Sequence, residues 1–236
     1  MHRDHLFLKP RQETSAFEFN TAVAQVFEDM IKRSVPGYQH ILSILGLLAR
    51  DLQQGRCYDL GCSLGAGCLM IAENIQNQQM PIIGVDNAPA MLEKARLNTQ
   101  QHANIELVCA DIEKIQIKNA ELIAMNFTLQ FIALEKRLAL LKKIRQGMNQ
   151  GGQLLLSEKI TFDNPKIDQF QQQLHHQFKR ENGYSDLEIS AKRAALENVL
   201  ISETLQTHQQ RLIDAGFKSV IVWFQCFNFI SLIATA

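Results

Sequence analysis

The residues with the clearest chemical pattern are Asp59, Gly61, Ser63 and Gly65, which occupy alternate positions of the segment D-L-G-C-S-L-G. A glycine-bearing turn between a strand and a helix lets a ligand approach the backbone and reach the N–H groups at the start of the helix. The glycine spacing, which continues to Gly67, does not fit the dinucleotide fingerprint G-x-G-x-x-G. No Lys-Ser/Thr pair follows, so the segment is not a P-loop either.

The segment does fit the pattern acid-x-Gly-x-(Gly/Ser)-x-Gly, with Ser63 where a second glycine is more usual. A loop of this pattern brings its backbone close to the amino acid end of S-adenosylmethionine. The alternative interpretation is a structural turn between a strand and a helix that binds nothing.

Polar residues also follow the next predicted strands. Asp86 comes about 20 residues after the glycine loop, where a carboxylate can accept both ribose hydroxyls. Its alternative role is capping the helix that begins near Pro89, although Asn87 could do this instead. Asp111-Ile112 could recognise the adenine edge, and Asn126 ends a further apolar strand. Because the carboxyl ends of parallel strands share one sheet edge, the set predicts an S-adenosylmethionine site there.

The elements that must position these residues alternate along the chain. We expect helices at 18–33 and 38–53, separated at Ser34–Tyr38, then strand 56–60, helix 64–77, strand 81–86, helix 89–101, strands 104–109 and 120–126, helix 134–148, strand 152–157, and final strands 218–225 and 228–234. This alternation predicts an α/β fold with a doubly wound, mostly parallel seven-stranded sheet of Rossmann-like methyltransferase type. The connection between the last two strands is too short for a crossover helix, so they should pair antiparallel. Asn149–Gly152 is interpreted as a helix stop and a turn.

Residues 163–216 form a polar helical pattern with breaks at Asn182-Gly183 and near Ser202. The capping box Ser185-Asp186-Leu187-Glu188 predicts a helix over 186–200, with Arg193 on its apolar stripe. A guanidinium there could bind a carboxylate, form an internal salt bridge, or extend to solvent. His175-His176 and Lys179-Arg180 could add positive potential or form a solvated face.

We therefore expect a single domain over 1–236, with an N-terminal arm and helices at 1–53 and a helical insertion at 163–216 that covers the site.

The amino-acid composition argues against several classes of function and location. Lys plus Arg equals Asp plus Glu at 24 each, so direct, tight nucleic-acid binding is disfavoured. Five cysteines without a C-x-x-C pair favour a reducing compartment. The charged N-terminus and the lack of a long apolar run predict a soluble, cytoplasmic protein that does not enter a membrane. Asn126–Leu129 is not the N-P-P-Y motif of amino-group methyltransferases, and no cysteine stands where a pyrimidine C5 methyltransferase needs its nucleophile.

Several longer motifs make the chain resemble the carboxy-S-adenosyl-L-methionine synthase family of the class I methyltransferase-like superfamily. They are R-S-V-P-G-Y (33–38), Y-D-L-G-C-S-L-G (58–65), N-F-T-L-Q-F (126–131), F-K-R-E-N-G-Y-S (178–185) and W-F-Q-C-F-N-F (223–229). The resemblance covers nearly the whole chain.

The resemblance implies an enzyme that converts S-adenosylmethionine and prephenate to carboxy-S-adenosylmethionine and phenylpyruvate. A separate tRNA carboxymethyltransferase would then use the product to form 5-oxyacetyl uridine at the wobble position. A reaction of this kind needs mainly a dry, positive pocket rather than an acid–base pair.

The resemblance also implies a homodimer without a metal and a set of ligand contacts. Tyr38 and Arg193 would hold the added carboxylate, with Arg193 reaching in from a partner subunit. The implied contacts are Tyr38, Gly61, Cys62, Ser63, Asp86, Asn87, Asp111, Ile112, Asn126 and Arg193. Two alternatives stay open: a small-molecule methyltransferase of the same fold, and a non-catalytic regulatory protein that binds S-adenosylmethionine.

Overall fold

The structure is a computed structural model that describes Asp4, residues 18–196 and residues 199–236, without the side chains of 192–196. The expected N-terminal arm therefore lies mostly outside the described residues. Asp4 is described, and it is buried.

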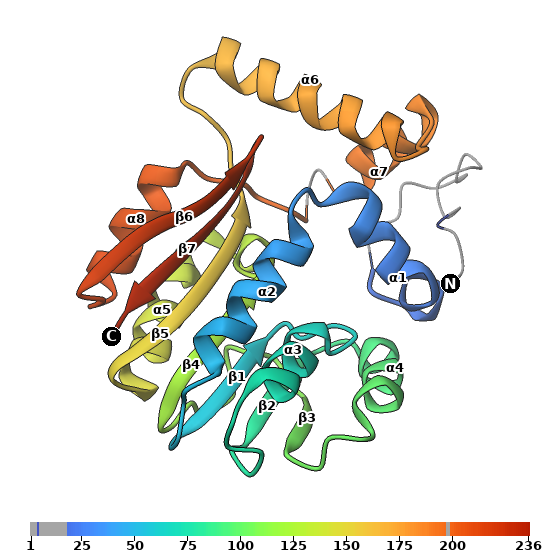
Figure 1. The fold of residues 1–236 in the computed structure, drawn as a ribbon. Coiled ribbons are helices and arrows are strands. Elements are labelled where there is room, and N and C mark those ends of the chain that lie inside the picture. The colour runs from blue at the N-terminus through green and yellow to red at the C-terminus, as the bar shows by residue number, and fades with distance from the viewer. Residues whose placement is uncertain (1–3, 5–17, 197–198) are drawn as a thin grey trace.

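A seven-stranded sheet with the order β3-β2-β1-β4-β5-β7-β6 forms the centre of the molecule (Figure 1). Its strands are β1 (Arg56–Leu60), β2 (Ile82–Asp86), β3 (Ile105–Cys109), β4 (Ala120–Asn126), β5 (Met148–Lys159), β6 (Ser219–Cys226) and β7 (Phe229–Thr235). The first five strands pair parallel, and β7 pairs antiparallel with both β5 and β6. The predicted fold class is therefore confirmed, including the antiparallel final strand.

The helices are α1 (Thr21–Ser34), α2 (Tyr38–Ala49), α3 (Ala66–Asn74), α4 (Pro89–Thr99), the short η1 (Leu129–Phe131), α5 (Leu134–Gly147), α6 (Pro165–Glu181), α7 (Asp186–Leu196) and α8 (Leu205–Asp214). They cover both faces of the sheet because successive strand residues point to opposite sides. Cys57 and Leu122 pack in the core with α2 and α3, whereas their neighbours Tyr58 and Ile123 pack in the core with α5 and α8.

Several predicted boundaries need correction. Asn149–Gly152 is not a helix stop and turn, because α5 ends at Gly147 and β5 already begins at Met148. The segment lies at a register shift between Ala120↔Met148 and Leu122↔Gln153, with Gly151 in the left-handed region at φ 82°. Glycine tolerates this conformation, and long-range pairing of β5 with β4 keeps the segment in the sheet.

The predicted helix over 38–53 ends earlier, at Ala49, and α3 covers only Ala66–Asn74 of the predicted 64–77. The first two residues of the predicted range, 64 and 65, belong to the glycine loop instead of the helix. The described part of the helix predicted over 186–200 ends at Leu196.

The helical region 163–216 divides as predicted into α6, α7 and α8. The capping box is present, since the backbone N–H of Ser185 donates to Glu188 Oε2 over 2.8 Å and the N–H of Glu188 donates to Ser185 Oγ over 3.3 Å. In Figure 1, α6 lies above the end of the sheet, whereas α8 lies beside α5.

Candidate active site

A cavity of about 380 Å³ opens at the carboxyl edge of the parallel strands. Predicted contacts from the ends of β2, β3 and β4, from α2 and from the loop after β1 line it. Those residues are Tyr38, Gly61, Cys62, Ser63, Asp86, Asn87, Asp111, Ile112 and Asn126. Arg193 belongs to α7, but its side chain lies outside the described residues.

Gly61 allows the loop after β1 to pass close to the end of β4. Its φ is +81°, and a Cβ atom there would lie 2.2 Å from Thr128 Oγ1. The backbone N–H groups of Gly61 and Cys62 both donate to the carbonyl of Val85, over 2.8 and 3.0 Å. The loop is thereby fixed to the neighbouring strand β2.

Ser63 is the non-glycine residue at the centre of this loop. It has a positive φ of 52°, which is uncommon for a residue with a side chain. Its hydroxyl is buried and has no hydrogen-bond partner among the described residues. Because a buried hydroxyl without a partner is costly, this atom fits a ligand that would complete its hydrogen bonding.

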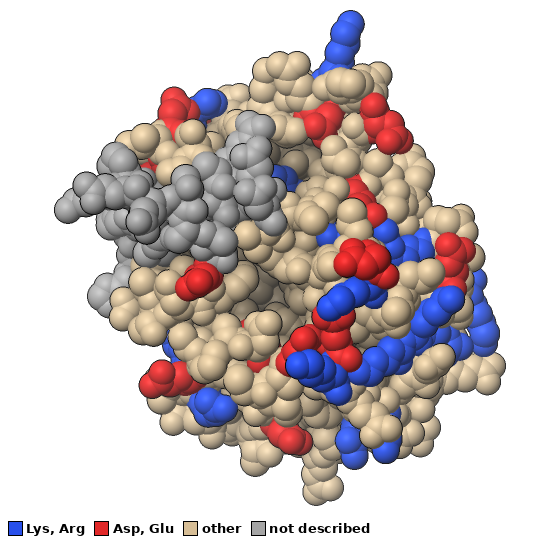
Figure 2. Space-filling view, turned by 180° about the vertical axis from the view of Figure 1, so that it is seen from behind, with Lys and Arg blue, Asp and Glu red and all other residues tan. Residues whose placement is uncertain are grey.

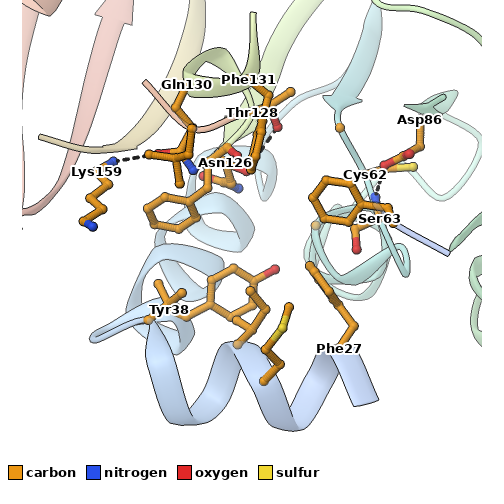
Figure 3. A pocket seen from close by; sticks show the side chains of 18 of the residues that line it. Phe27, Tyr38, Cys62, Ser63, Asp86, Asn126, Thr128, Gln130, Phe131 and Lys159 are labelled. Atoms are coloured by element: carbon orange, nitrogen blue, oxygen red, sulfur yellow. Dashed lines mark hydrogen bonds between the residues drawn. The ribbon is translucent and has the colours of Figure 1, made fainter. Parts of the chain in front are cut away.

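Two backbone N–H groups hold the Asp86 carboxylate in place, and Figure 3 shows the one from Ser63. Its Oδ2 accepts the N–H of Ser63 over 2.8 Å, and its Oδ1 accepts the N–H of Ala88 over 2.9 Å. Neither Asp86 nor Asn87 caps α4, because Ala88 occupies the N-cap position and makes no side-chain cap bond. Burial raises the pKa of Asp86, while the backbone N–H groups counteract that shift. The carboxylate is therefore oriented into the cavity rather than used by the helix.

Asp59 also lines the cavity, although its sequence position indicated only a place in the loop pattern. It is buried, and this burial raises its pKa to about 7, with a hydrogen bond from Cys68 opposing the shift and the charge of Asp86 adding to it. Gly67 leaves room for it, since a Cβ there would lie 2.4 Å from Asp59 Oδ2. A positive group in the cavity would favour the ionised form of Asp59.

Asp111 and Ile112 follow β3. Asp111 Oδ1 accepts the N–H of Glu113 over 2.9 Å, which fixes the turn, and Ile112 is buried against the core. This pair gives the cavity a polar atom beside an apolar surface.

Asn126 is oriented by a chain of hydrogen bonds that crosses the sheet. Trp223 Nε1 donates to Ser231 Oγ over 2.8 Å, and Ser231 lies 2.9 Å from Ser157 Oγ. Ser157 Oγ then donates to Asn126 Oδ1 over 2.7 Å. Since the amide oxygen is the acceptor, the amide N–H₂ of Asn126 is directed to other partners.

Aromatic side chains form the middle of the cavity. The Phe127 ring lies 6.4 Å from that of Tyr38 and 5.8 Å from that of Phe229. Phe127 has φ +56°, and the buried pairing of its N–H with the carbonyl of Ser157 over 2.7 Å holds this unusual conformation. Burial, with the Asp59 charge adding to it, raises the pKa of Tyr38, so its hydroxyl is a neutral donor at neutral pH.

Basic residues line the other end. Lys159 ends β5, while Lys179 and His175 come from α6. The sequence indicated His175 and Lys179 as a possible positive surface, but Lys159 was missed. Its signal was available, because Lys159 ends a strand at the same sheet edge as Asn126.

The N-terminal region holds α6 and α7 over this end of the sheet. Arg33 of α1 donates to the carbonyl of Asn182 over 2.7 Å and lies 3.9 Å above the Tyr184 ring. Tyr184 in turn donates to Asp4 Oδ2 over 2.6 Å. His175 Nε2 lies 2.8 Å from the carbonyl of Ser34. These contacts join the end of α1 to both ends of the turn between α6 and α7.

The described part of the chain shows no group of three His, Cys, Asp or Glu side chains that could hold a metal ion. Within the same residues, no helix is long and apolar enough to cross a bilayer. The expectation of a metal-free site stays a prediction.

Comparison with known proteins gives close relatives over the full length. The carboxy-S-adenosyl-L-methionine synthase of Geobacter sp. strain M21 is 52% identical and is matched over 98% of this chain and 97% of its own length. Those of Actinobacillus pleuropneumoniae serotype 5b and Salmonella paratyphi C are each 49% identical, over 99% of this chain. The chain belongs to the carboxy-S-adenosyl-L-methionine synthase family. It is therefore a transferase of that family, as the sequence motifs predicted.

The fold of this chain is of the methyltransferase type. A family model described as a methyltransferase domain matches residues 58–152, which include the end of β1, the glycine loop and β2 to β4. Human N-acetylserotonin methyltransferase, solved with S-adenosylmethionine, superposes with a TM-score of 0.62 at 16% identity over 91% of this chain and 55% of its own. The YcgJ protein of Bacillus subtilis superposes with a TM-score of 0.60 at 16% identity, over 79% of this chain and 71% of its own. The chain thus spans little more than half of the human enzyme, and both likenesses concern the fold alone.

Proposed function

We propose that this chain converts S-adenosylmethionine and prephenate to carboxy-S-adenosylmethionine, phenylpyruvate and water. The observation that carries the proposal is one cavity that joins the strand-end carboxylates to a basic end, in a member of this synthase family. The product would be the carboxymethyl donor for wobble uridine modification, carried out on tRNA by a separate enzyme.

The cavity offers a partner for each part of S-adenosylmethionine. Asp86 would accept the ribose hydroxyls, with Asn87 beside it, and Asp111 with Ile112 would contact adenine. The loop Gly61–Ser63 would meet the amino acid end, where the buried Ser63 hydroxyl gains a partner. The Asp59 carboxylate would balance the positive charge of the ligand.

Prephenate supplies both the carbon dioxide and the base that the reaction needs. Loss of its ring carboxylate as carbon dioxide leaves an electron pair that makes the ring aromatic and expels the ring hydroxyl as hydroxide. The hydroxide takes a proton from the methyl group beside the positive sulfur, giving water, and the methyl carbon then bonds to carbon dioxide. The protein would mainly hold the reactants together and exclude water. The aromatic side chains of Tyr38 and Phe127, with the buried Phe229, supply such surroundings.

The new carboxylate would be held by Tyr38 and Arg193. The Tyr38 hydroxyl stays a neutral donor, and arginine binds carboxylates with two parallel hydrogen bonds. As part of the proposal, Arg193 comes from the partner subunit of a homodimer.

We further propose a cytoplasmic location and no tight nucleic-acid binding. All five cysteine thiols are free, as in a reducing compartment. On the face shown in Figure 2, basic and acidic side chains are interspersed, which agrees with equal totals of 24 each.

The test is to incubate the purified protein with S-adenosylmethionine and prephenate and to measure the nucleoside product by mass spectrometry. A gain of one carboxyl group on the nucleoside, with equimolar phenylpyruvate, is the expected result. S-adenosylhomocysteine formed with a methyl acceptor would instead indicate a small-molecule methyltransferase. Nucleoside recovered unchanged would indicate a binding protein without turnover.

A further inference from the structure

The charged residues that line the cavity are separated by sign. Asp59, Asp86 and Asp111 come from the ends of β1 and β2 and the turn after β3. Lys159 comes from the end of β5, which lies on the other side of β4 from β1, and Lys179 comes from α6. The cavity therefore presents a negative half to one ligand and a positive half to another.

His175 lines the cavity together with the two lysines. Burial is the main cause that lowers the pKa of His175 to about 2, and the charges of Lys179 and Lys159 lower it further. The ring also lies 4.8 Å from Phe229, edge to face. Because His175 stays neutral and its Nε2 is paired with the carbonyl of Ser34, the positive charge at this end belongs to the lysines.

Lys159 is also held by a buried support. Its backbone N–H donates to Gln130 Oε1 over 3.3 Å, as Figure 3 shows, and Gln130 Nε2 donates to the carbonyl of Phe127 over 3.2 Å. The neighbouring Glu158 is fully buried and accepts the N–H groups of Leu129 and Gln130 over 2.9 and 3.1 Å. The end of β5 is thereby fixed to η1, and the base of the Lys159 side chain has a defined position.

We propose that Lys159 and Lys179 form the subsite that binds the carboxylate which prephenate retains, the one on its pyruvyl side chain. The inference rests on the proposed function and adds the residues that recognise the second substrate. Prephenate is a dianion, so it requires positive charge in the cavity, while the cyclohexadiene ring would lie against the aromatic side chains of Phe127 and Phe229.

The choice between the two carboxylates follows from the chemistry. The ring carboxylate loses its charge when it leaves as carbon dioxide, so ion pairs to it would be stronger in the ground state than in the transition state. Such pairs would slow the reaction. The pyruvyl carboxylate keeps its charge throughout, so lysines bound to it hold the substrate without opposing decarboxylation. Phenylpyruvate carries the same group and should occupy the same subsite.

The experiment compares Lys159→Met and Lys179→Met with the control Lys166→Met. Methionine keeps the length and apolar character of the lysine stem, and Lys166 is an exposed residue on the same helix as Lys179. Affinity for S-adenosylmethionine is measured by calorimetry, KM for prephenate by turnover, and the inhibition constant of phenylpyruvate by competition. We expect each cavity variant to raise both the KM and the inhibition constant by about 10- to 100-fold, the scale of a charge-assisted contact. Affinity for S-adenosylmethionine should change less than about twofold, and the control should resemble wild type.

Three outcomes would overturn the subsite. Unchanged KM in both cavity variants would place prephenate elsewhere. A raised KM with unchanged inhibition by phenylpyruvate would assign the lysines to the ring carboxylate. Equal loss for prephenate and S-adenosylmethionine, or loss of the folded state by circular dichroism, would make them structural. Failure of the proposed function is separate, because wild type would then form no carboxylated nucleoside at all.

Discussion

Single side chains that line the cavity are held in place by hydrogen bonds. Asp86 is the clearest case, since both of its oxygens accept backbone N–H groups and yet it lines the cavity. The substitution Asp86→Asn therefore tests its role, because it removes the charge and keeps the shape of the side chain.

We expect Asp86→Asn to weaken binding of S-adenosylmethionine and of carboxy-S-adenosylmethionine equally, by more than about 10-fold, since both contain the ribose. Calorimetric titration of both ligands measures this, with Glu93→Gln on the exposed side of α4 as the control. An unchanged affinity would remove the ribose assignment.

Arg193 should behave differently from Asp86. If it binds the added carboxylate, Arg193→Ala weakens carboxy-S-adenosylmethionine by about 10- to 100-fold and leaves S-adenosylmethionine nearly unaffected. The same titrations measure it, with the exposed Arg96→Ala as the control. Equal loss for both ligands would mean that Arg193 is structural.

At the level of elements, the site depends on close approach between the loop after β1 and the end of β4. Gly61 meets Thr128 at this point, and the Ser157–Ser231–Trp223 chain fixes the neighbouring Asn126. The ends of the strands are therefore positioned by contacts across the sheet as well as by their own backbones.

We expect Gly61→Ala to reduce affinity for S-adenosylmethionine and to lower the free energy of unfolding by roughly 1–3 kcal/mol, the cost of backbone strain plus a steric clash. Gly151→Ala is a matched control, because Gly151 has φ +82° and no atom lies within 4 Å of the position that its Cβ would take. Urea denaturation and ligand titration of both variants separate the clash from the strain. If the two variants lose equal stability and binding, the contact with Thr128 does not matter.

For the molecule as a whole, buried ionisable groups make stability depend on pH. His175 is neutral in the fold, where burial lowers its pKa to about 2, but in the unfolded chain it titrates near 6.5. Below pH 6.5, His175 binds a proton in the unfolded chain but not in the folded protein. The free energy of unfolding therefore decreases as the pH falls. Glu158 acts in the opposite sense, because burial raises its pKa to about 8 and its contribution falls as the pH rises from about 4.5.

We expect wild type to lose stability relative to His175→Gln between pH 6.5 and 5, with a limiting slope of about 1.4 kcal/mol per pH unit. Urea unfolding of both proteins at each pH measures the difference, from which the contribution of Glu158 cancels because both proteins contain it. Parallel stability curves for the two proteins would show that His175 does not titrate in this way.

Local sequence patterns were enough to predict the order of the elements and the strand-end positions of the polar residues. Alternating apolar strands and helices give a parallel sheet with one carboxyl edge, so Asp86, Asp111 and Asn126 had to meet there once the strands paired. The capping box at Ser185 was likewise predictable, because its hydrogen bonds join residues three positions apart.

The charges of the two halves of the cavity, in contrast, depend on the three-dimensional fold. The burial of Asp59, the joining of Lys159 and Lys179 around His175, and the continuation of β5 through Gly151 all depend on residues far apart in the chain. Sequence periodicity reports which face of an element is buried, but not which distant side chains share that interior. The cofactor was therefore predictable from local patterns, whereas the subsite proposed for the second substrate required the fold.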